Sequence, residues 1–352
     1  MPNNKFLMWK PAWLLILFLL LLGLGFVAVR QEWVGGEWEI HELSGIAMGT
    51  TYSIKLVANS RSQILLKKTQ KSVDNRLKEI DGAMSTYKYD SELSRFNRHL
   101  STDPFPVSDD VLEVFLLAQM VSIQSNGAFD VTIKPLVDAW GFGPDDSPIL
   151  IPDTLQLAAL KKHTGFQKIV VDSMSSSLIK KDPQVTADLS AIAKGYAVDG
   201  VAKVLIGLGF SDFLFELGGE LRAAGTKPNG ARWVVGIEAP ALGDLSIYDT
   251  IELQDNSIAT SGDYRNLWED GGIKFSHIIN PSTGWPLPYI GISVTVIHER
   301  AVLADAWTTA MSVLGSQTGI FLADKLGLQV IFVKKEASNF IDIPSRKFHN
   351  PP

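Results

Sequence analysis

The chain has 352 residues, of which 46% are hydrophobic, a formal net charge of −6, and no cysteine. This apolar content is enough for a packed core and excludes a disordered or fibrous protein. The modest acidic charge without a basic block argues against nucleic acid as a partner. The absence of cysteine excludes disulfides, thiolate chemistry and a lipid anchor on a cysteine.

The N-terminal segment predicts a membrane anchor. Residues 11–30 form an almost unbroken apolar run after Lys5 and Lys10, long enough as a helix to cross about 30 Å of hydrocarbon. The lysines favour a cytoplasmic N-terminus at residues 1–10. The alternative, a cleaved signal peptide, usually has a shorter apolar core that ends in small residues. We therefore expect a signal anchor, a spacer at residues 31–42, and a body on the periplasmic side of the inner membrane.

Beyond the spacer, strands and helices follow one another without a regular rhythm. Alternating or apolar runs predict strands at residues 52–57, 168–172, 178–180, 213–217, 233–237, 250–253, 292–297 and 328–333. Apolar spacing and end signals predict helices at residues 61–83, 109–126, 152–165, 301–314 and just after Tyr196. We expect polar loops at Met84–Asn97 and His277–Gly284, and a strand end at Gln184–Ala187. This mixture predicts one α+β domain at residues 43–335, followed by a C-terminal tail at residues 336–352.

The stretch D-L-S-A-I-A-K-G-Y, residues 188–196, is expected at a strand-to-helix junction. Backbone amides and carbonyls at such junctions are available to a ligand. Asp188 offers a hydrogen-bond acceptor, Lys194 offers a cation, and Gly195 permits close backbone approach. The alternative interpretation is a capping Asp, a surface Lys and a packing Gly, and the stretch by itself does not decide between the two.

A second stretch, A-D-A-W-T-T-A at residues 304–310, places Asp305 and Thr309 four residues apart on one helix face. A carboxylate and a hydroxyl suit a hard cation such as Mg²⁺. Two side-chain ligands are too few by themselves, and a solvated Asp beside a Thr bonded to its own helix is the alternative. The chain has no phosphate loop and no G-x-G-x-x-G fingerprint, so any nucleotide is held by another arrangement.

Several motifs in order resemble the ApbE family, the FAD:protein FMN transferases. The resemblance covers about residues 43–335 and implies an ApbE-like fold. The motifs that carry it are M-G-T-T-Y, M-S-T-Y-K-Y-D-S-E-L-S-R-F-N, G-A-F-D-V-T-I-K-P-L, D-L-S-A-I-A-K-G-Y-A-V-D, L-G-G-E-L, S-G-D-Y-R-N, H-I-I-N-P-S-T-G and A-D-A-W-T-T-A.

The resemblance implies that FAD is bound as a substrate with Mg²⁺ and that its pyrophosphate is cleaved. FMN passes to a threonine of a target protein, and AMP is released. The acceptors that the resemblance implies are flavoprotein subunits of membrane redox complexes. By position, the implied FAD contacts are Met48, Tyr87, Ala128, Phe129, Asp130, Asp188, Lys194 and Ile279. The implied metal ligands are Asp305, Thr309 and the backbone carbonyl of Ala191, and the implied catalytic residues are Asp305 and His277, the latter as a candidate base.

The chain departs from the family pattern in three places. Asn280 stands where relatives often have Asp, and Ala191 stands where some have Ser or Thr, which a backbone ligand tolerates. The N-terminus has an apolar run instead of a lipoprotein cysteine. Two other functions use the same residues and stay open at this point. One is an FAD-binding or storage protein, and the other is a Mg²⁺-dependent FAD pyrophosphatase in which water replaces the threonine.

Overall fold

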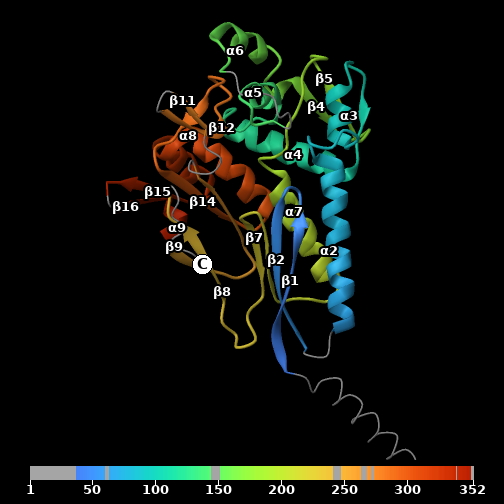
Figure 1. Ribbon diagram of the computed structural model, residues 1–352, viewed down its shortest axis with the longest axis vertical. Helices are drawn as coiled ribbons and strands as arrows, with labels where there is room; N and C mark the ends of the chain where they lie inside the picture. Colours follow the sequence, from blue (N-terminus) through green and yellow to red (C-terminus); the bar gives the residue numbers. More distant parts are fainter. Residues whose placement is uncertain are drawn as a thin grey trace, which may run out of the picture.

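The computed structural model describes residues 37–59, 63–143, 151–240, 247–262, 268–270, 273–337 and 339–349. Its centre is an eight-stranded sheet in the order β1-β2-β6-β7-β10-β14-β15-β16 (Figure 1), and all neighbouring strands are antiparallel. The strands are β1 (Trp38–Ala47), β2 (Thr50–Asn59), β6 (Phe213–Leu217), β7 (Glu220–Ala224), β10 (Ser257–Gly262), β14 (Ile292–His298), β15 (Gln329–Glu336) and β16 (Asn339–Pro344).

The two faces of this sheet bury different partners because side chains alternate along each strand. Leu56 and Val296 join the main core, which also contains the apolar sides of helices α2 (Gln63–Met84), α7 (Ala193–Gly207) and α8 (Ala301–Leu326). The next residues, Val57 and Ile297, belong to a smaller cluster under the ribbon of β8 (Trp233–Glu238) and β9 (Ile247–Leu253). The sheet therefore has a helical layer on one face and a two-stranded ribbon on the other.

Shorter elements lie beyond one end of the large sheet, at the top of Figure 1. They include two three-stranded sheets, in the orders β3-β5-β4 and β11-β12-β13. Their bounds, with those of the last helix α9, are α3 (Glu92–Arg98), β3 (Phe105–Pro106), α4 (Asp109–Gln124), η1 (Val131–Ile133), α5 (Lys134–Ala139), α6 (Thr154–Lys161), η2 (Phe166–Lys168), β4 (Ile169–Asp172), β5 (Ser177–Lys180), β11 (Trp268–Asp270), β12 (Ile273–Ile279), β13 (Pro286–Pro288) and α9 (Arg346–His349).

The expected mixed α+β architecture is confirmed, but three local predictions are wrong. Met84–Asn97 is not wholly a polar loop, because Ser91 caps helix α3, which buries Leu93 and Phe96. Gln184–Ala187 forms no strand, since the side chain of Asn97 bonds both backbone groups of Ala187, at 2.7 and 2.8 Å. The third error concerns His277, which lies on strand β12 and not in a loop.

The ends of the domain extend past the expected limits. β1 begins at Trp38, inside the expected spacer, and pairs with β2 from Trp38↔Asn59 onward. β16 and α9 occupy the segment expected as a tail, and Glu336 pairs with Asn339. The predicted anchor at residues 11–30 lies outside the described residues. Among those described, the structure contains no helix with the length and apolarity needed to cross a membrane.

Candidate active site

The junction at residues 188–196 meets helix α8 at Gly195. The Gly195 N–H donates to the Asp305 carboxylate (Oδ2) at 2.9 Å. A Cβ atom on Gly195 would lie 2.4 Å from the Ala301 carbonyl oxygen and 2.7 Å from the Asp305 Cβ. Glycine is therefore needed here because α7 and α8 pack backbone to backbone. Two motifs separated by more than a hundred residues of sequence thus meet in space.

Beside this contact, three charged side chains form an incompletely paired cluster of Lys194, Glu220 and Asp305. The Lys194 ammonium lies 2.7 Å from Glu220 Oε1. Glu220 is buried, and its other oxygen, Oε2, has no hydrogen-bond partner in the described part of the chain. Burial and the nearby Asp305 charge raise the pKa of Glu220 to about 7. Burial likewise raises the pKa of Asp305, while Lys194 opposes that shift. With both carboxylates ionised, the cluster carries one negative charge in excess.

These residues fit a divalent cation. An unpartnered carboxylate oxygen and a second buried carboxylate are costly without a nearby positive charge. Ala191 directly precedes Ile192, the N-cap of α7, and Thr309 lies one turn beyond Asp305 on the same helix face. The neighbouring Thr308 hydroxyl is already used, since it donates to the Asp305 carbonyl at 2.6 Å.

No group of three or more His, Cys, Asp or Glu side chains that could hold a metal occurs among the described residues. A magnesium site needs no such group when carbonyls, hydroxyls and water complete the shell. The set Ala191, Asp305 and Thr309 stays a prediction, and Glu220 is a residue that sequence reasoning missed. Its signal in the sequence is its place in the L-G-G-E-L motif.

The Ala128–Asp130 run is attached to the same junction. The Asp188 N–H donates to the Val131 carbonyl at 2.7 Å, and the Asp188 carboxylate accepts from the Ser190 N–H at 2.7 Å. The Asp130 carboxylate accepts from Thr132 and from the Phe166 N–H, and the Phe129 ring is buried in the main core. The Phe129 and Asp130 side chains therefore hold the loop in place.

Strand β12 brings His277 and Ile279 to the same end of the molecule. His277 is half-buried, whereas Ile279 packs in a buried cluster with Leu136 and Trp140 of the α5 region. The Trp140 indole N–H donates to the Gly284 carbonyl at 2.8 Å, which fixes the turn after β12 to α5. Because α5 follows the Asp130 run directly, β12 and that run are held as one unit.

Asn280 holds the turn that follows β12. Its side-chain oxygen accepts from the Ser282 N–H at 2.9 Å and from the Ser282 hydroxyl at 2.7 Å. A carboxylate could accept the same two hydrogen bonds. The departure from the family pattern at this position therefore keeps the local structure.

Met48 and Tyr87 lie near the C-terminal end of α2. Met48 occupies the turn between β1 and β2 with φ of 50° and packs against the main core. It borders a hollow that is also lined by Leu77 and Asp81 of α2. Tyr87 follows α2, and its ring is 71% exposed. An exposed ring of this kind can stack on a flat ligand, so the predicted role of Tyr87 is compatible with its position.

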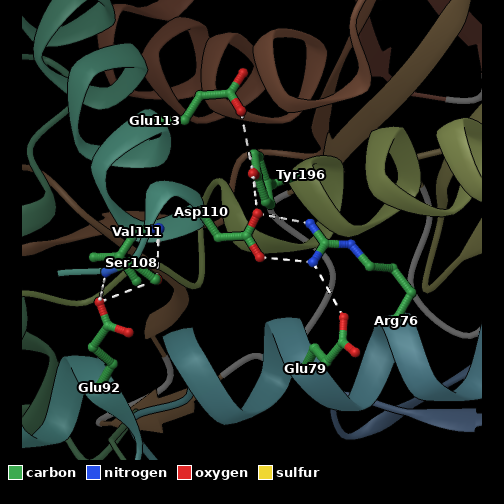
Figure 2. Close-up of polar contacts among 8 residues, drawn as sticks. All are labelled: Arg76, Glu79, Glu92, Ser108, Asp110, Val111, Glu113 and Tyr196. Atoms are coloured by element: carbon green, nitrogen blue, oxygen red, sulfur yellow. Dashed lines mark hydrogen bonds and ion pairs between the residues drawn. The ribbon is translucent and has the colours of Figure 1, made fainter. Parts of the chain in front are cut away.

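A second charged cluster, shown in Figure 2, forms around Tyr196 of α7. The Arg76 guanidinium donates two hydrogen bonds of 2.7 Å to Asp110, and the Tyr196 hydroxyl donates to Asp110 at 2.6 Å and to Glu113 at 3.2 Å. Arg300 lies 2.6 Å from Glu113. These contacts join α2, α4, α7 and the start of α8, so Tyr196 is a structural residue of the motif.

The carboxylate of Asp199 completes this second cluster. It accepts from the Ala301 N–H at 2.9 Å and the Val302 N–H at 3.2 Å, and thereby caps the N-terminus of α8. Since α8 carries Asp305 and α7 carries Lys194, this cap and the Tyr196 contacts set the two helices relative to each other.

Comparison with known proteins gives a consistent result. The ApbE family profile matches residues 48–332. An FAD:protein FMN transferase of Vibrio cholerae is 40% identical over 311 residues, which cover 88% of this chain and 92% of the relative. The protein of the same description from Escherichia coli K12 is 37% identical, with 86% of each chain covered.

Solved structures of similar fold agree with these relatives. The flavin transferase ApbE from Vibrio cholerae has a TM-score of 0.80 at 38% identity and covers 89% of this chain and 99% of its own. The flavinyl transferase ApbE from Pseudomonas stutzeri in its apo form has a TM-score of 0.79 at 34% identity, covering 89% and 96%.

The fold and these relatives thus place the chain in the flavin transferase class. The chain belongs to the ApbE family.

Proposed function

We propose that this chain is an FAD:protein FMN transferase. It binds FAD, cleaves the pyrophosphate, attaches FMN to a threonine hydroxyl of a target protein and releases AMP. The observation that carries this proposal is the meeting of the 188–196 junction with Asp305, next to a buried carboxylate that has an unpaired oxygen. Relatives at up to 40% identity that bear this description support it.

In this proposal the cation is held by the Asp305 carboxylate, the Thr309 hydroxyl and the Ala191 carbonyl. Mg²⁺ supplies positive charge that stabilises the phosphate oxygens during transfer. Lys194 adds a second positive contact to the pyrophosphate, and its ion pair with Glu220 fixes where the ammonium lies. His277 on β12 is the candidate base that removes the proton of the acceptor threonine.

FAD would contact the segments around this junction. The proposed contacts are Met48, Tyr87, Ala128, Phe129, Asp130, Asp188, Lys194 and Ile279. The Phe129 and Asp130 side chains act by holding their loop, because both are buried and used internally.

The acceptors would be flavoprotein subunits of membrane redox complexes. The apolar run at residues 11–30 would anchor the chain in the inner membrane, with the catalytic domain on the periplasmic side. The proposed anchor would hold the enzyme on the membrane that carries the proposed acceptors.

The test incubates the full chain with FAD, Mg²⁺ and threonine-containing acceptor peptides, and measures peptide mass and released AMP. A mass gain equal to FMN, together with AMP, is expected. AMP without a labelled peptide would identify a pyrophosphatase instead. Retained FAD with neither product would identify a storage protein.

A further inference from the structure

Asn97, the last residue of the M-S-T-Y-K-Y-D-S-E-L-S-R-F-N motif, holds the chain immediately before Asp188. Its side-chain amide donates to the Ala187 carbonyl at 2.8 Å, and its side-chain oxygen accepts from the Ala187 N–H at 2.7 Å. Asn97 and Ala187 are both buried. Two residues that face each other on antiparallel strands exchange the same pair of hydrogen bonds. One amide side chain therefore takes the place of a neighbouring strand at this point.

The position of the junction depends on this contact, because no strand supports its upstream half. In the described structure, residues 185–189 belong to no helix or strand. Beyond them, the Ala193 N–H donates to the Leu189 carbonyl at 2.8 Å and closes the turn that contains Ala191. A shift of Ala187 would therefore displace the Ala191 carbonyl, which is a predicted ligand of the cation.

Helix α3, which carries Asn97 near its C-terminal end, also supports the loop of Tyr87. The Ser91 and Ser94 hydroxyls both donate to the Ser85 carbonyl, at 2.5 and 3.3 Å. The Ser85 hydroxyl accepts from the Tyr87 N–H at 3.2 Å. Ser91 is the N-cap of α3 and Ser94 lies in its first turn. The predicted stacking residue and the junction are thus held by opposite ends of one short helix.

A buried lysine fixes the backbone of Asn97. Lys180 on β5 is only 1% exposed, and its ammonium donates to the Asn97 carbonyl at 3.1 Å. The same nitrogen lies 4.8 Å from the centroid of the Phe96 ring. A cation at the C-terminal carbonyls of a helix is favourable, although burial lowers the pKa of Lys180 to about 8. Lys180 therefore holds the end of α3 that carries Asn97.

We propose that Asn97 is a positioning residue that places the 188–196 junction against the cation and FAD. This inference rests on the proposed function, since Asp188 and Ala191 are predicted contacts of those ligands. The Asn97 side chain is buried and bonded to Ala187, so it acts through the junction and not by direct contact. Groups that orient metal ligands in this way change metal affinity by about 10–100-fold when they are removed.

The experiment compares two alanine variants of the full chain. Asn97→Ala removes both hydrogen bonds to Ala187. Ser345→Ala is the matched control, because the buried Ser345 hydroxyl also accepts from a backbone N–H, that of Val330 at 3.0 Å, and donates to a backbone carbonyl, that of Leu328 at 2.8 Å. Thermal unfolding, Mg²⁺ affinity by calorimetry and FAD affinity by flavin fluorescence are measured for each.

Both variants should unfold at a lower temperature than the parent, because each loses two buried hydrogen bonds. The Mg²⁺ affinity of Asn97→Ala should fall at least about tenfold, whereas that of Ser345→Ala should stay within about twofold of the parent. At saturating Mg²⁺ and FAD, Asn97→Ala should recover most of the parental rate of FMN transfer. A residue that positions a ligand raises the concentration needed and leaves the chemical step in place.

Lys180→Met provides a second test that holds if Asn97→Ala does not fold. Methionine keeps an apolar contact with Phe96 and removes the hydrogen bond to the Asn97 carbonyl. Because a buried charge is removed, this variant should be at least as stable as the parent. Its Mg²⁺ affinity should nevertheless fall by about threefold or more. A residue that only stabilises the fold would not lower affinity while stability is kept.

Three results would overturn the inference. They are parental affinities for Mg²⁺ and FAD in a folded Asn97→Ala, an equal loss of affinity in Ser345→Ala, and, where Asn97→Ala does not fold, parental affinities in Lys180→Met. The proposed function is judged separately. If the parent binds FAD and Mg²⁺ but labels no acceptor peptide, the transferase proposal fails, and the affinities still decide the role of Asn97.

Discussion

Two charged clusters form around Tyr196 and Lys194, which are two residues apart on α7. We call them the outer and the inner cluster, and they differ in how completely their charges are paired. The outer cluster around Tyr196 pairs Arg76 with Asp110 through two short hydrogen bonds and Arg300 with Glu113. The inner cluster around Lys194 has two buried carboxylates, one ammonium and an oxygen without a hydrogen-bond partner among the described residues. A satisfied network stabilises a fold, whereas an incomplete one indicates a missing ligand. The comparison therefore assigns the outer cluster to the positioning of α7 against its neighbours and the inner cluster to the proposed chemistry.

The largest expected effect comes from Asp305→Asn in the inner cluster. The amide oxygen can still accept from the Gly195 N–H, so the α7–α8 contact is kept while the charge is lost. We expect FMN transfer to fall by about a thousandfold or more and Mg²⁺ binding to disappear in calorimetry. Asp172→Asn, at the end of β4, is the matched control, because the carboxylate there likewise accepts a backbone N–H, that of Met174. Unchanged Mg²⁺ affinity in Asp305→Asn would remove this residue from the cation site.

His277→Ala tests the proposed base. Loss of a general base typically costs about 10²–10⁴ in rate, and the dependence of the transfer rate on pH should flatten. FAD affinity, measured by fluorescence, should stay near that of the parent. A full transfer rate across the pH range would rule His277 out as the base.

Glu220→Gln should have a smaller effect that depends on pH. The raised pKa of Glu220, about 7, means that this group favours the folded metal-free protein at low pH, and that this contribution is lost as the pH rises through 7. Mg²⁺ requires the ionised carboxylate, so we expect its affinity to rise between pH 6 and 8 in the parent. Calorimetry should show a flatter profile in Glu220→Gln, with affinity about tenfold lower at pH 8. Equal slopes in both proteins would show that Glu220 does not act on the cation.

Tyr196→Phe in the outer cluster should have the smallest effect on activity. It removes hydrogen bonds to Asp110 and Glu113, and we expect the free energy of unfolding to fall by about 1 kcal/mol. The transfer rate should stay within about twofold of the parent. Chemical denaturation and a transfer assay on the same sample provide the measurement. A large loss of rate without a loss of stability would contradict the division between the two clusters.

Much of the fold could be predicted from sequence because local signals agree with it. The alternation in residues 213–217 and the Asn126-Gly127 stop gave β6 and the end of α4 nearly correctly. The Gln184–Ala187 prediction failed because its hydrogen-bond partner is the side chain of Asn97, 90 residues away. Local periodicity carries no information about such a partner.

The candidate site was predicted only in part, because local sequence does not show which distant residues pack together. The motifs around Asp188 and Asp305 each indicated a ligand site. The structure joins the two motifs through the hydrogen bond from the Gly195 N–H to the Asp305 carboxylate. Glu220 was missed because a glutamate at the start of a strand is ordinarily solvated, and only the tertiary structure buries it beside Asp305. His277 was placed in a loop because the turn residues that follow it outweighed a short strand.

The central claim is that oxygen atoms of residues 191, 305 and 309 hold one cation beside the FAD pyrophosphate. Anomalous diffraction from a crystal of the protein with FAD and Mn²⁺ in place of Mg²⁺ tests it most directly. The account predicts one strong metal peak within bonding distance of the Asp305 carboxylate, the Thr309 hydroxyl and the Ala191 carbonyl, next to the FAD phosphates. A metal peak elsewhere, or bound FAD with no metal at this position, would contradict it.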